Sequence, residues 1–222
     1  MARPQVLIFD VNETLLDLAE LRSVLAAALG GGERLAEWFF RLLHGSLVAN
    51  ATDSFRSFET IGVEALRAVS LRQGAELSEA QAKELVARFR SLSPHPDVAA
   101  GLDRLVGAGF RLIALSNGSR IGLPAQLENA GIIDRFEMIV SVEEAGRFKP
   151  DPAPYHVALE RAAVEPGHAL MVAAHDWDII GARAVGIRGA FITRPGVVWT
   201  VPHELPELTP RNIRELAALL GA

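Results

Sequence analysis

The sequence contains no cysteine, and this absence excludes several kinds of chemistry at once. Without thiols a chain forms no disulfides, uses no thiol nucleophile and holds no zinc through sulfur. The chain also has no cluster of Lys and Arg, and its formal net charge is -5. Nucleic acids bind basic surfaces, so nucleic acid is not an expected partner. The amino terminus carries only a four-residue apolar run, too short for a signal peptide core or a membrane span. We therefore expect a cytoplasmic protein without membrane contact.

The composition supports a sizeable folded core. Half of the 222 residues are hydrophobic, which is enough for one large domain or for one domain with an insertion. Between residues 17 and 93 the signals are all helical, because Leu and Ala recur at helical spacing. The helices expected there cover residues 15–29, 33–50, 57–73 and 78–92. Ser78 and Gln81 form a capping pair at the start of the last one.

From residue 94 onward, helix and strand signals alternate. The expected strands cover residues 110–115, 138–141, 169–173 and 189–193, and the helices between them include 98–108, 155–163 and 179–185. Alternating units of this kind predict a parallel sheet with right-handed crossovers. The predicted fold is a doubly wound, Rossmann-like α/β core made of residues 1–16 and 94–222. A helical cap, residues 17–93, interrupts the core after its first strand.

The first strand ends in the residue around which we expect the functional site. The apolar run before Asp10 is typical of a parallel strand that is buried on both faces. Ligands of open α/β sheets bind outside the carboxyl ends of the strands. Asp10 is therefore a candidate nucleophile, and Thr14 is expected to order the loop that follows. The alternative is an ordinary strand-end acid followed by a helix-capping threonine.

Three later segments are predicted to reach the same edge of the sheet: Ser116-Asn117, Lys149, and His175 to Asp178. Each alone has an ordinary alternative, namely a turn, a solvated loop lysine or a helix cap. Together they supply what an aspartate nucleophile needs. Lys149 can hold Asp10 ionised, Ser116 can donate a hydrogen bond to it, and Asp178 can position Lys149.

These motifs, in this order, resemble those of the haloacid dehalogenase superfamily, whose hydrolases attack the substrate with the first aspartate. Most members are phosphatases, which use a second Asp as general acid and hold magnesium with two acids four residues apart. This chain has Asn12 at the acid position and Ala174 four residues before Asp178. An amide is no general acid, and an alanine side chain has no ligand atom. The chain is therefore most similar to the type II (S)-2-haloacid dehalogenases, which work without metal, and no cofactor is expected.

The resemblance implies a reaction and a set of site residues. Asp10 attacks the halogen-bearing carbon of a short 2-haloacid, such as a haloacetate or a 2-halopropionate, and water then hydrolyses the resulting ester to a 2-hydroxy acid. Arg41 matches the cap arginine that receives the halide, unless it is a solvated helix residue, and Asn117 matches the amide partner of that arginine. The residues implied to contact substrate are Val11, Asn12, Arg41, Ser116, Asn117, Tyr155 and Trp177. A homodimer is the expectation from the family.

Some assignments stay open at this point. Better-known dehalogenases have Ser-Ser-Asn where this chain has Ala173-Ala174-His175, so His175 either positions the hydrolytic water or merely lies beside a helix start. Tyr155 either reaches Lys149 with its hydroxyl or packs, and packing is also the simpler interpretation for Trp177. A magnesium-dependent phosphatase with an eroded site and a non-catalytic binding protein remain alternative functions.

Overall fold

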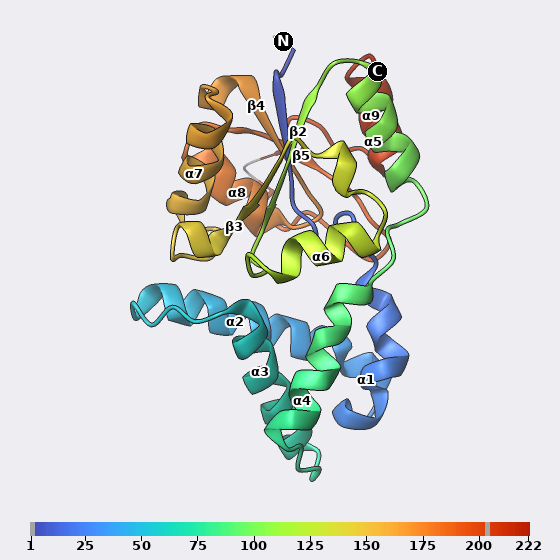
Figure 1. Ribbon diagram of the computed structural model, residues 1–222, viewed down its shortest axis with the longest axis vertical. Helices are drawn as coiled ribbons and strands as arrows, with labels where there is room; N and C mark the ends of the chain where they lie inside the picture. The colour runs from blue at the N-terminus through green and yellow to red at the C-terminus, as the bar shows by residue number, and fades with distance from the viewer. Residues whose placement is uncertain (1–2, 203–204) are drawn as a thin grey trace.

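The computed structural model describes residues 3–202 and 205–222, and it builds them around a five-stranded parallel sheet (Figure 1). The strands are β1 (Val6–Phe9), β2 (Arg111–Ser116), β3 (Met138–Ser141), β4 (Ala169–Ala173) and β5 (Arg188–Phe191). Their order is β3-β2-β1-β4-β5, so the first strand lies in the middle of the sheet. Phe9, the last residue of β1, pairs with Ala114 on one side and Val172 on the other. The residue after it is thereby placed at the centre of the carboxyl edge.

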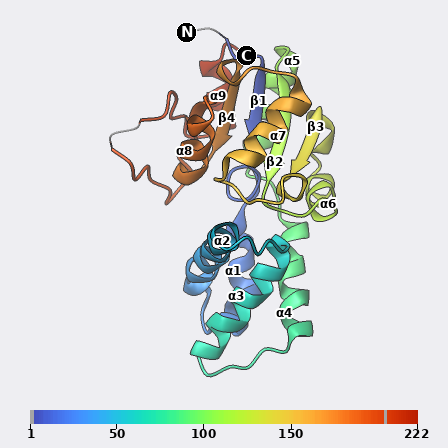
Figure 2. The same cartoon turned by 90° about the vertical axis from the view of Figure 1, so that its left-hand side faces the viewer.

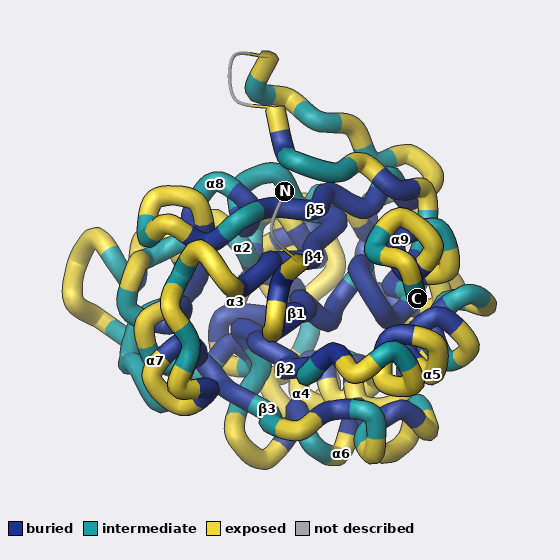
Figure 3. The backbone as a smooth tube through the Cα atoms, turned by 90° about the horizontal axis from the view of Figure 1, so that it is seen from above, coloured by how far each residue is buried: buried dark blue, intermediate teal, exposed yellow. Residues whose placement is uncertain are grey.

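The strands are buried on both faces, which is why they are apolar without alternation. Leu7 and Phe9 face one apolar cluster, and Val6 and Ile8 face the other. The first face is covered by α5 (Val98–Gly107), α6 (Gly122–Asn129) and α9 (Ile213–Leu219), and the second by α7 (Pro152–Ala162) and α8 (Asp176–Ala184). Seen from above, the buried strands run through the middle of a ring of helices (Figure 3). The predicted doubly wound α/β core is confirmed.

The helical region lies beyond the carboxyl edge of the sheet (Figures 1 and 2). Its helices are α1 (Leu21–Leu29), α2 (Leu35–Ala51), α3 (Phe58–Arg72) and α4 (Glu79–Val86). Trp38 is fully buried, and its indole N–H donates to the carbonyl of Gly62 at 3.0 Å, which ties α2 to α3. The two connections to the core run side by side, because Asp17 N–H donates to Ser93 O at 2.9 Å. In the described part of the chain, no helix combines the length and apolarity needed to cross a membrane.

Several element boundaries differ from the expectation by one to three residues, and larger differences in the cap and after β4 have local reasons. The side chain of Asp17 accepts from the N–H of Ala19, so a 3-10 turn, Leu18–Glu20, precedes α1. The capping box of Ser78 and Gln81 is present, but the α-helix gives way to a 3-10 turn at Ala87. Helix α8 begins at Asp176, three residues earlier than expected, which brings the polar residues after β4 into its first turn.

The close approach of α5 and α9 offers a test of the packing. A Cβ on Gly101 would lie 2.7 Å from Ile213 Cγ2 and 2.9 Å from the Ile213 carbonyl carbon. We expect Gly101→Ala to lower the free energy of unfolding by about 1–3 kcal/mol in urea denaturation, because α9 must move. A Cβ on Gly107 of the same helix would meet nothing within 4 Å. Gly107→Ala should therefore stabilise the protein by roughly 0.5–1 kcal/mol, and equal effects of the two changes would contradict the packing.

Candidate active site

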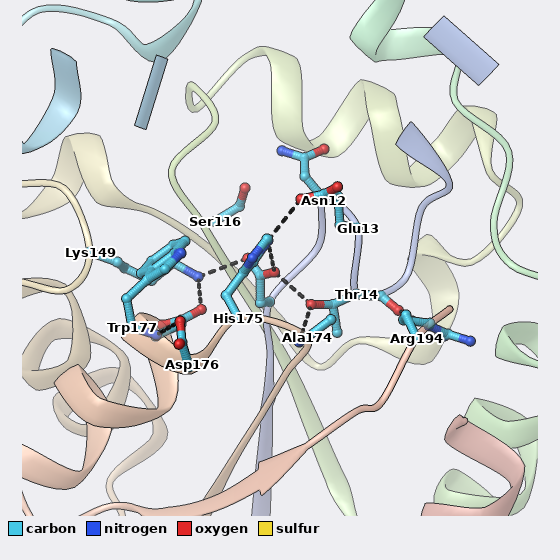
Figure 4. A network of polar contacts seen from close by, with 12 residues as sticks. Asn12, Glu13, Thr14, Ser116, Lys149, Ala174, His175, Asp176, Trp177 and Arg194 are labelled. Atoms are coloured by element: carbon cyan, nitrogen blue, oxygen red, sulfur yellow. Dashed lines mark hydrogen bonds and ion pairs between the residues drawn. The ribbon is translucent and has the colours of Figure 1, made fainter. Parts of the chain in front are cut away.

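The strand ends bring together side chains from segments far apart in the sequence (Figure 4). Asp10 follows β1, Lys149 precedes α7, and Asp178 lies in the first turn of α8. The Lys149 ammonium donates to Asp10 Oδ1 at 2.9 Å, to Asp178 Oδ2 at 2.6 Å and to the carbonyl of Leu115 at 2.9 Å. These contacts use all three donors of the ammonium group. The lysine, at 2% exposure, is thus a fully bonded buried cation between two carboxylates.

The three ionisable groups affect one another strongly. Burial raises the pKa of Asp10, but attraction to Lys149 and His175 and hydrogen bonds from Thr14 and Lys149 outweigh it, so the pKa lies below its ordinary value. Burial lowers the pKa of Lys149, yet the two carboxylates outweigh it and raise the pKa above its ordinary value. For Asp178, burial and repulsion from Asp10 prevail over attraction to Lys149 and raise the pKa. The cluster therefore favours the ionised form of Asp10.

Thr14 fixes the second oxygen of Asp10 and the loop that carries it. Its hydroxyl donates to Asp10 Oδ2 at 2.7 Å and accepts from the backbone N–H of Ala174 at 2.8 Å. Arg194 binds the carbonyl of Thr14 through Nε and Nη2, at 3.1 and 2.8 Å. The loop after β1 is held from β4 and from the segment after β5.

Ser116, the last residue of β2, and Asn117, the residue after it, accept hydrogen bonds from backbone N–H groups around the site. Ser116 Oγ accepts from Gly118 N–H at 3.1 Å, and in the described part of the chain it has no hydrogen bond to Asp10. Asn117 Oδ1 accepts from the backbone N–H of Lys149 at 3.0 Å. Ser116 and Asn117 therefore lie where predicted, but their contacts position the turn and Lys149.

Tyr155 reaches a different partner from the one predicted. Its hydroxyl donates to Asp178 Oδ1 at 2.6 Å and lies 3.1 Å from the Asp178 carbonyl, not on Lys149. A Cβ on Gly181, one turn further along α8, would lie 2.7 Å from that hydroxyl, so only glycine leaves room for this approach. Burial and the neighbouring Asp178 raise the pKa of Tyr155 well above its ordinary value, which keeps the hydroxyl a donor.

His175 lies near Asp10 and packs against two aromatic rings. Its ring stacks on Trp177 with centroids 5.0 Å apart, and Phe39 of α2 lies on it at 6.1 Å. Nε2 lies 3.9 Å from Asp10 Oδ2 and 3.5 Å from Glu13 Oε2. Trp177 thus packs on the imidazole, as the simpler interpretation held, and the packing aims Nε2 at Asp10.

A cavity of about 530 Å³ opens beside His175, at the boundary between cap and core. Its wall combines polar and apolar side chains from both regions, and includes Glu13, Glu33, Phe39, Leu43, His95, His175 and Arg194. The cavity is large enough for several waters or a small organic acid, and His175 forms part of its wall.

Arg41 is not brought to this cluster. On α2 it lies about 200° around the helix from Phe39, the residue that contacts His175. Its guanidinium pairs with Glu37 at 3.2 Å, and Arg72 pairs with the same carboxylate at 3.5 Å. The prediction placed a halide-binding arginine over Asp10, whereas the structure places Arg41 on the face of α2 that points away from the core.

Asn12 and Val11, the two residues after the nucleophile, are both held from within the protein. Asn12 Oδ1 accepts from Gln126 Nε2 at 2.9 Å, and the same Nε2 donates to the carbonyl of Phe89 at 2.8 Å. The Val11 side chain is fully buried in the apolar core rather than facing a ligand. The position next to the nucleophile thus carries a fixed amide and no acid.

The comparisons with known proteins show the family of this chain. A family model described as haloacid dehalogenase-like hydrolase matches residues 4–186. (S)-2-Haloacid dehalogenase 1 of Pseudomonas sp. (strain CBS-3) is 32% identical over 190 residues, which are 84% of this chain and 83% of the relative. The chain belongs to the 2-haloacid dehalogenase family.

Two further members of the family match over nearly the whole chain. (S)-2-Haloacid dehalogenase H-109 of Pseudomonas putida is 29% identical over 215 residues, 96% of this chain and 95% of the relative. The solved structure of the L-2-haloacid dehalogenase from Xanthobacter autotrophicus has a TM-score of 0.90 at 25% identity and covers 99% of each chain. The predicted family and the predicted sheet with a helical cap are confirmed.

The residues present do not fit the magnesium ion of the phosphatase branch. Both carboxylate oxygens of Asp178 accept from donors, Oδ1 from Tyr155 and Oδ2 from Lys149, and the side chain is fully buried. Ala174, four residues earlier, offers no side-chain ligand, and its N–H is bonded to Thr14. Among the described residues no group of three or more His, Asp and Glu is arranged to hold a metal ion.

Three residues near Asp10 were not predicted from the sequence. Glu13 was not identified from the sequence, although an acidic residue directly before Thr14 is a local signal. Phe39 lies two residues before Arg41, and the helical period could have placed it on the other face of α2. Gln126 lies 114 residues from its partner Asn12, and no local signal points to it.

The contact between Tyr155 and Asp178 yields a stability prediction. Tyr155→Phe leaves a buried carboxylate oxygen without its donor, so we expect a loss of about 1.5–3 kcal/mol in urea denaturation. Ser46→Ala is the matched control: its buried hydroxyl donates at 3.0 Å to the carbonyl of Leu42, which is a neutral acceptor. The control should cost below about 1 kcal/mol, and an equal cost for both would contradict the role assigned to Tyr155.

Proposed function

We propose that the protein is a metal-independent dehalogenase of short 2-haloacids, with Asp10 as the nucleophile. The observation that carries the proposal is a buried carboxylate kept ionised by Lys149, with the fixed amide of Asn12 where a proton donor would stand. A departing halide needs neither a proton nor a metal, whereas a departing alkoxide from a phosphate ester needs an acid. The names of the relatives support the same substrate class.

In the first step, an oxygen of Asp10 attacks the halogen-bearing carbon from the side opposite the halogen. The new carbon–oxygen bond forms as the carbon–halogen bond breaks, and the halide leaves with the electron pair. Attack inverts the configuration of a chiral carbon. Lys149 stabilises the carboxylate in the ground state, and burial strips it of water that would weaken it as a nucleophile.

In the second step, water attacks the carbonyl carbon of the Asp10 ester. The substrate carbon is not touched again, so the 2-hydroxy acid keeps the inverted configuration. The proposed base is His175, because Nε2 lies 3.9 Å from Asp10 Oδ2, a span that one water can bridge.

For the halide we assign the amide of Asn117. Its Oδ1 accepts from Lys149 N–H, so its NH2 group is turned to the other side and can donate to an anion. A donor placed where negative charge develops stabilises the transition state more than the substrate.

The proposal is tested by a paired release assay. With 2-chloropropionate or a haloacetate, we expect halide release that a chelator does not reduce, and background phosphate release from an aryl phosphate with or without magnesium. Asp10→Asn should abolish halide release and the trapped ester that mass spectrometry finds on Asp10. Asp176→Asn makes the same type of change at the first residue of α8, and its halide release should stay within about two-fold of wild type. Phosphate release that requires magnesium, or binding without any ester on Asp10, would overturn the proposal.

The assignment of the halide site has its own test. We expect Arg41→Gln to keep halide release within about three-fold of wild type, because an exposed pair with Glu37 is all that it removes. Asn117→Ala should lower the first turnover about 10–100-fold. Because the change also removes the acceptor of the buried Lys149 N–H, the thermal midpoint should fall by a few degrees, and an unchanged far-UV circular dichroism spectrum is the evidence of folding. A larger loss in Arg41→Gln than in Asn117→Ala would assign the halide to the arginine.

A further inference from the structure

Glu13 adopts a backbone conformation that its side chain disfavours. Its φ is +62°, in the left-handed region, where a Cβ crowds the backbone and glycine is preferred. The described residues contain two other non-glycine positions of this kind, Asp53 and Ala163, and both lie outside the cluster around Asp10. Backbone strain that persists next to a reactive group points to a use for the side chain.

The side chain of Glu13 is aimed at His175. Its Oε2 lies 3.5 Å from His175 Nε2, the same ring atom that faces Asp10 Oδ2 at 3.9 Å (Figure 4). The carboxylate is about one third exposed, and both residues line the cavity between cap and core. Nε2 therefore stands between the cavity and the nucleophile, with one acid on each side.

The His175 ring contacts two aromatic side chains. It stacks on Trp177 with centroids 5.0 Å apart and an interplanar angle of 21°, and it lies 6.1 Å from the Phe39 ring at 31°. Both distances from Nε2 exceed a direct hydrogen bond, and each is within the reach of one bridging water. A water in front of Nε2 can donate one hydrogen bond to the ring and the other to Glu13 Oε2. In that orientation a lone pair of the water oxygen points towards Asp10.

We propose that Glu13 is a positioning residue for hydrolysis of the Asp10 ester: with His175 it orients the water that enters from the cavity. The inference rests on the proposed function and extends it to the second half-reaction. A negative charge 3.5 Å from Nε2 also stabilises the imidazolium that forms when His175 takes the proton.

The step balances as follows. The water oxygen bonds to Asp10 Cγ as one water proton passes to His175 Nε2. The bond then breaks between Cγ and the ester oxygen that is attached to the substrate carbon. That oxygen keeps the electron pair and takes the proton from the imidazolium. Asp10 retains the oxygen of the water. The second proton of that water leaves to solvent when the Asp10 carboxyl group ionises. The products are the 2-hydroxy acid, the free carboxylate and one proton.

The test separates the two half-reactions and uses the strain at Glu13. In Glu13→Gly, the strain is relieved, so the thermal midpoint should equal or exceed that of wild type. We expect the first turnover of halide release to stay within about two-fold, while steady-state release falls about 100-fold and the Asp10 ester accumulates. Glu13→Gln keeps the side-chain size and should show the same burst. Glu128→Gln makes the same change at an exposed residue of α6 that does not line the cavity, and it should behave as wild type.

The outcomes distinguish this inference from the proposed function. If the wild-type protein forms no ester on Asp10 and releases no halide, the function itself fails, and the role of Glu13 falls with it. If the wild type turns over, then a Glu13→Gln steady state equal to wild type overturns the inference alone. An equal loss in the burst and the steady state also overturns it, because Glu13 would then act on the attack step.

Discussion

The buried ammonium of Lys149 is the group on which the rest of the site depends. A lone charge at this depth would be strongly disfavoured, and two carboxylates and a carbonyl offset that cost. In return the lysine favours the ionised form of Asp10. Tyr155 completes the arrangement by bonding the far oxygen of Asp178, which leaves that acid no oxygen for a metal. One buried cation thus favours the ionised form of Asp10 and holds one oxygen of Asp178.

The cap takes part in holding this cation. Asn50 of α2 donates to Phe148 O at 2.8 Å and accepts from Phe148 N–H at 2.9 Å. The Phe148 ring is fully buried and stacks on Phe55 with centroids 4.7 Å apart. Phe148 immediately precedes Lys149. The contacts of the cap with Phe148 therefore also help to position the lysine.

The departures from the family pattern gather around one side of Asp10. Ala174 gives only its backbone N–H, to Thr14, while the neighbouring His175 turns its ring towards the nucleophile and Glu13. On α2 the ring of Phe39, and not the guanidinium of Arg41, lies over this imidazole. The changes are physically connected through His175, which is what a shared role in the water step would require.

The α/β core, the helical cap and the carboxylate after β1 could be predicted from the sequence alone, because apolar runs and helical periods are local patterns. The carboxyl ends of parallel strands also meet at the same edge of the sheet. The sequence also brought Lys149 and Asp178 to that edge. The side-chain contacts could be read from the tertiary structure and not from the sequence. They are the hydrogen bond of Tyr155 with Asp178, the packing of one face of α2 on the core, and the approach of Glu13 to His175. Such contacts depend on helix rotation and on loop backbone angles. These are fixed by packing between segments that are 23 residues apart for Tyr155 and Asp178 and more than a hundred apart for the contacts of His175 with Glu13 and Phe39.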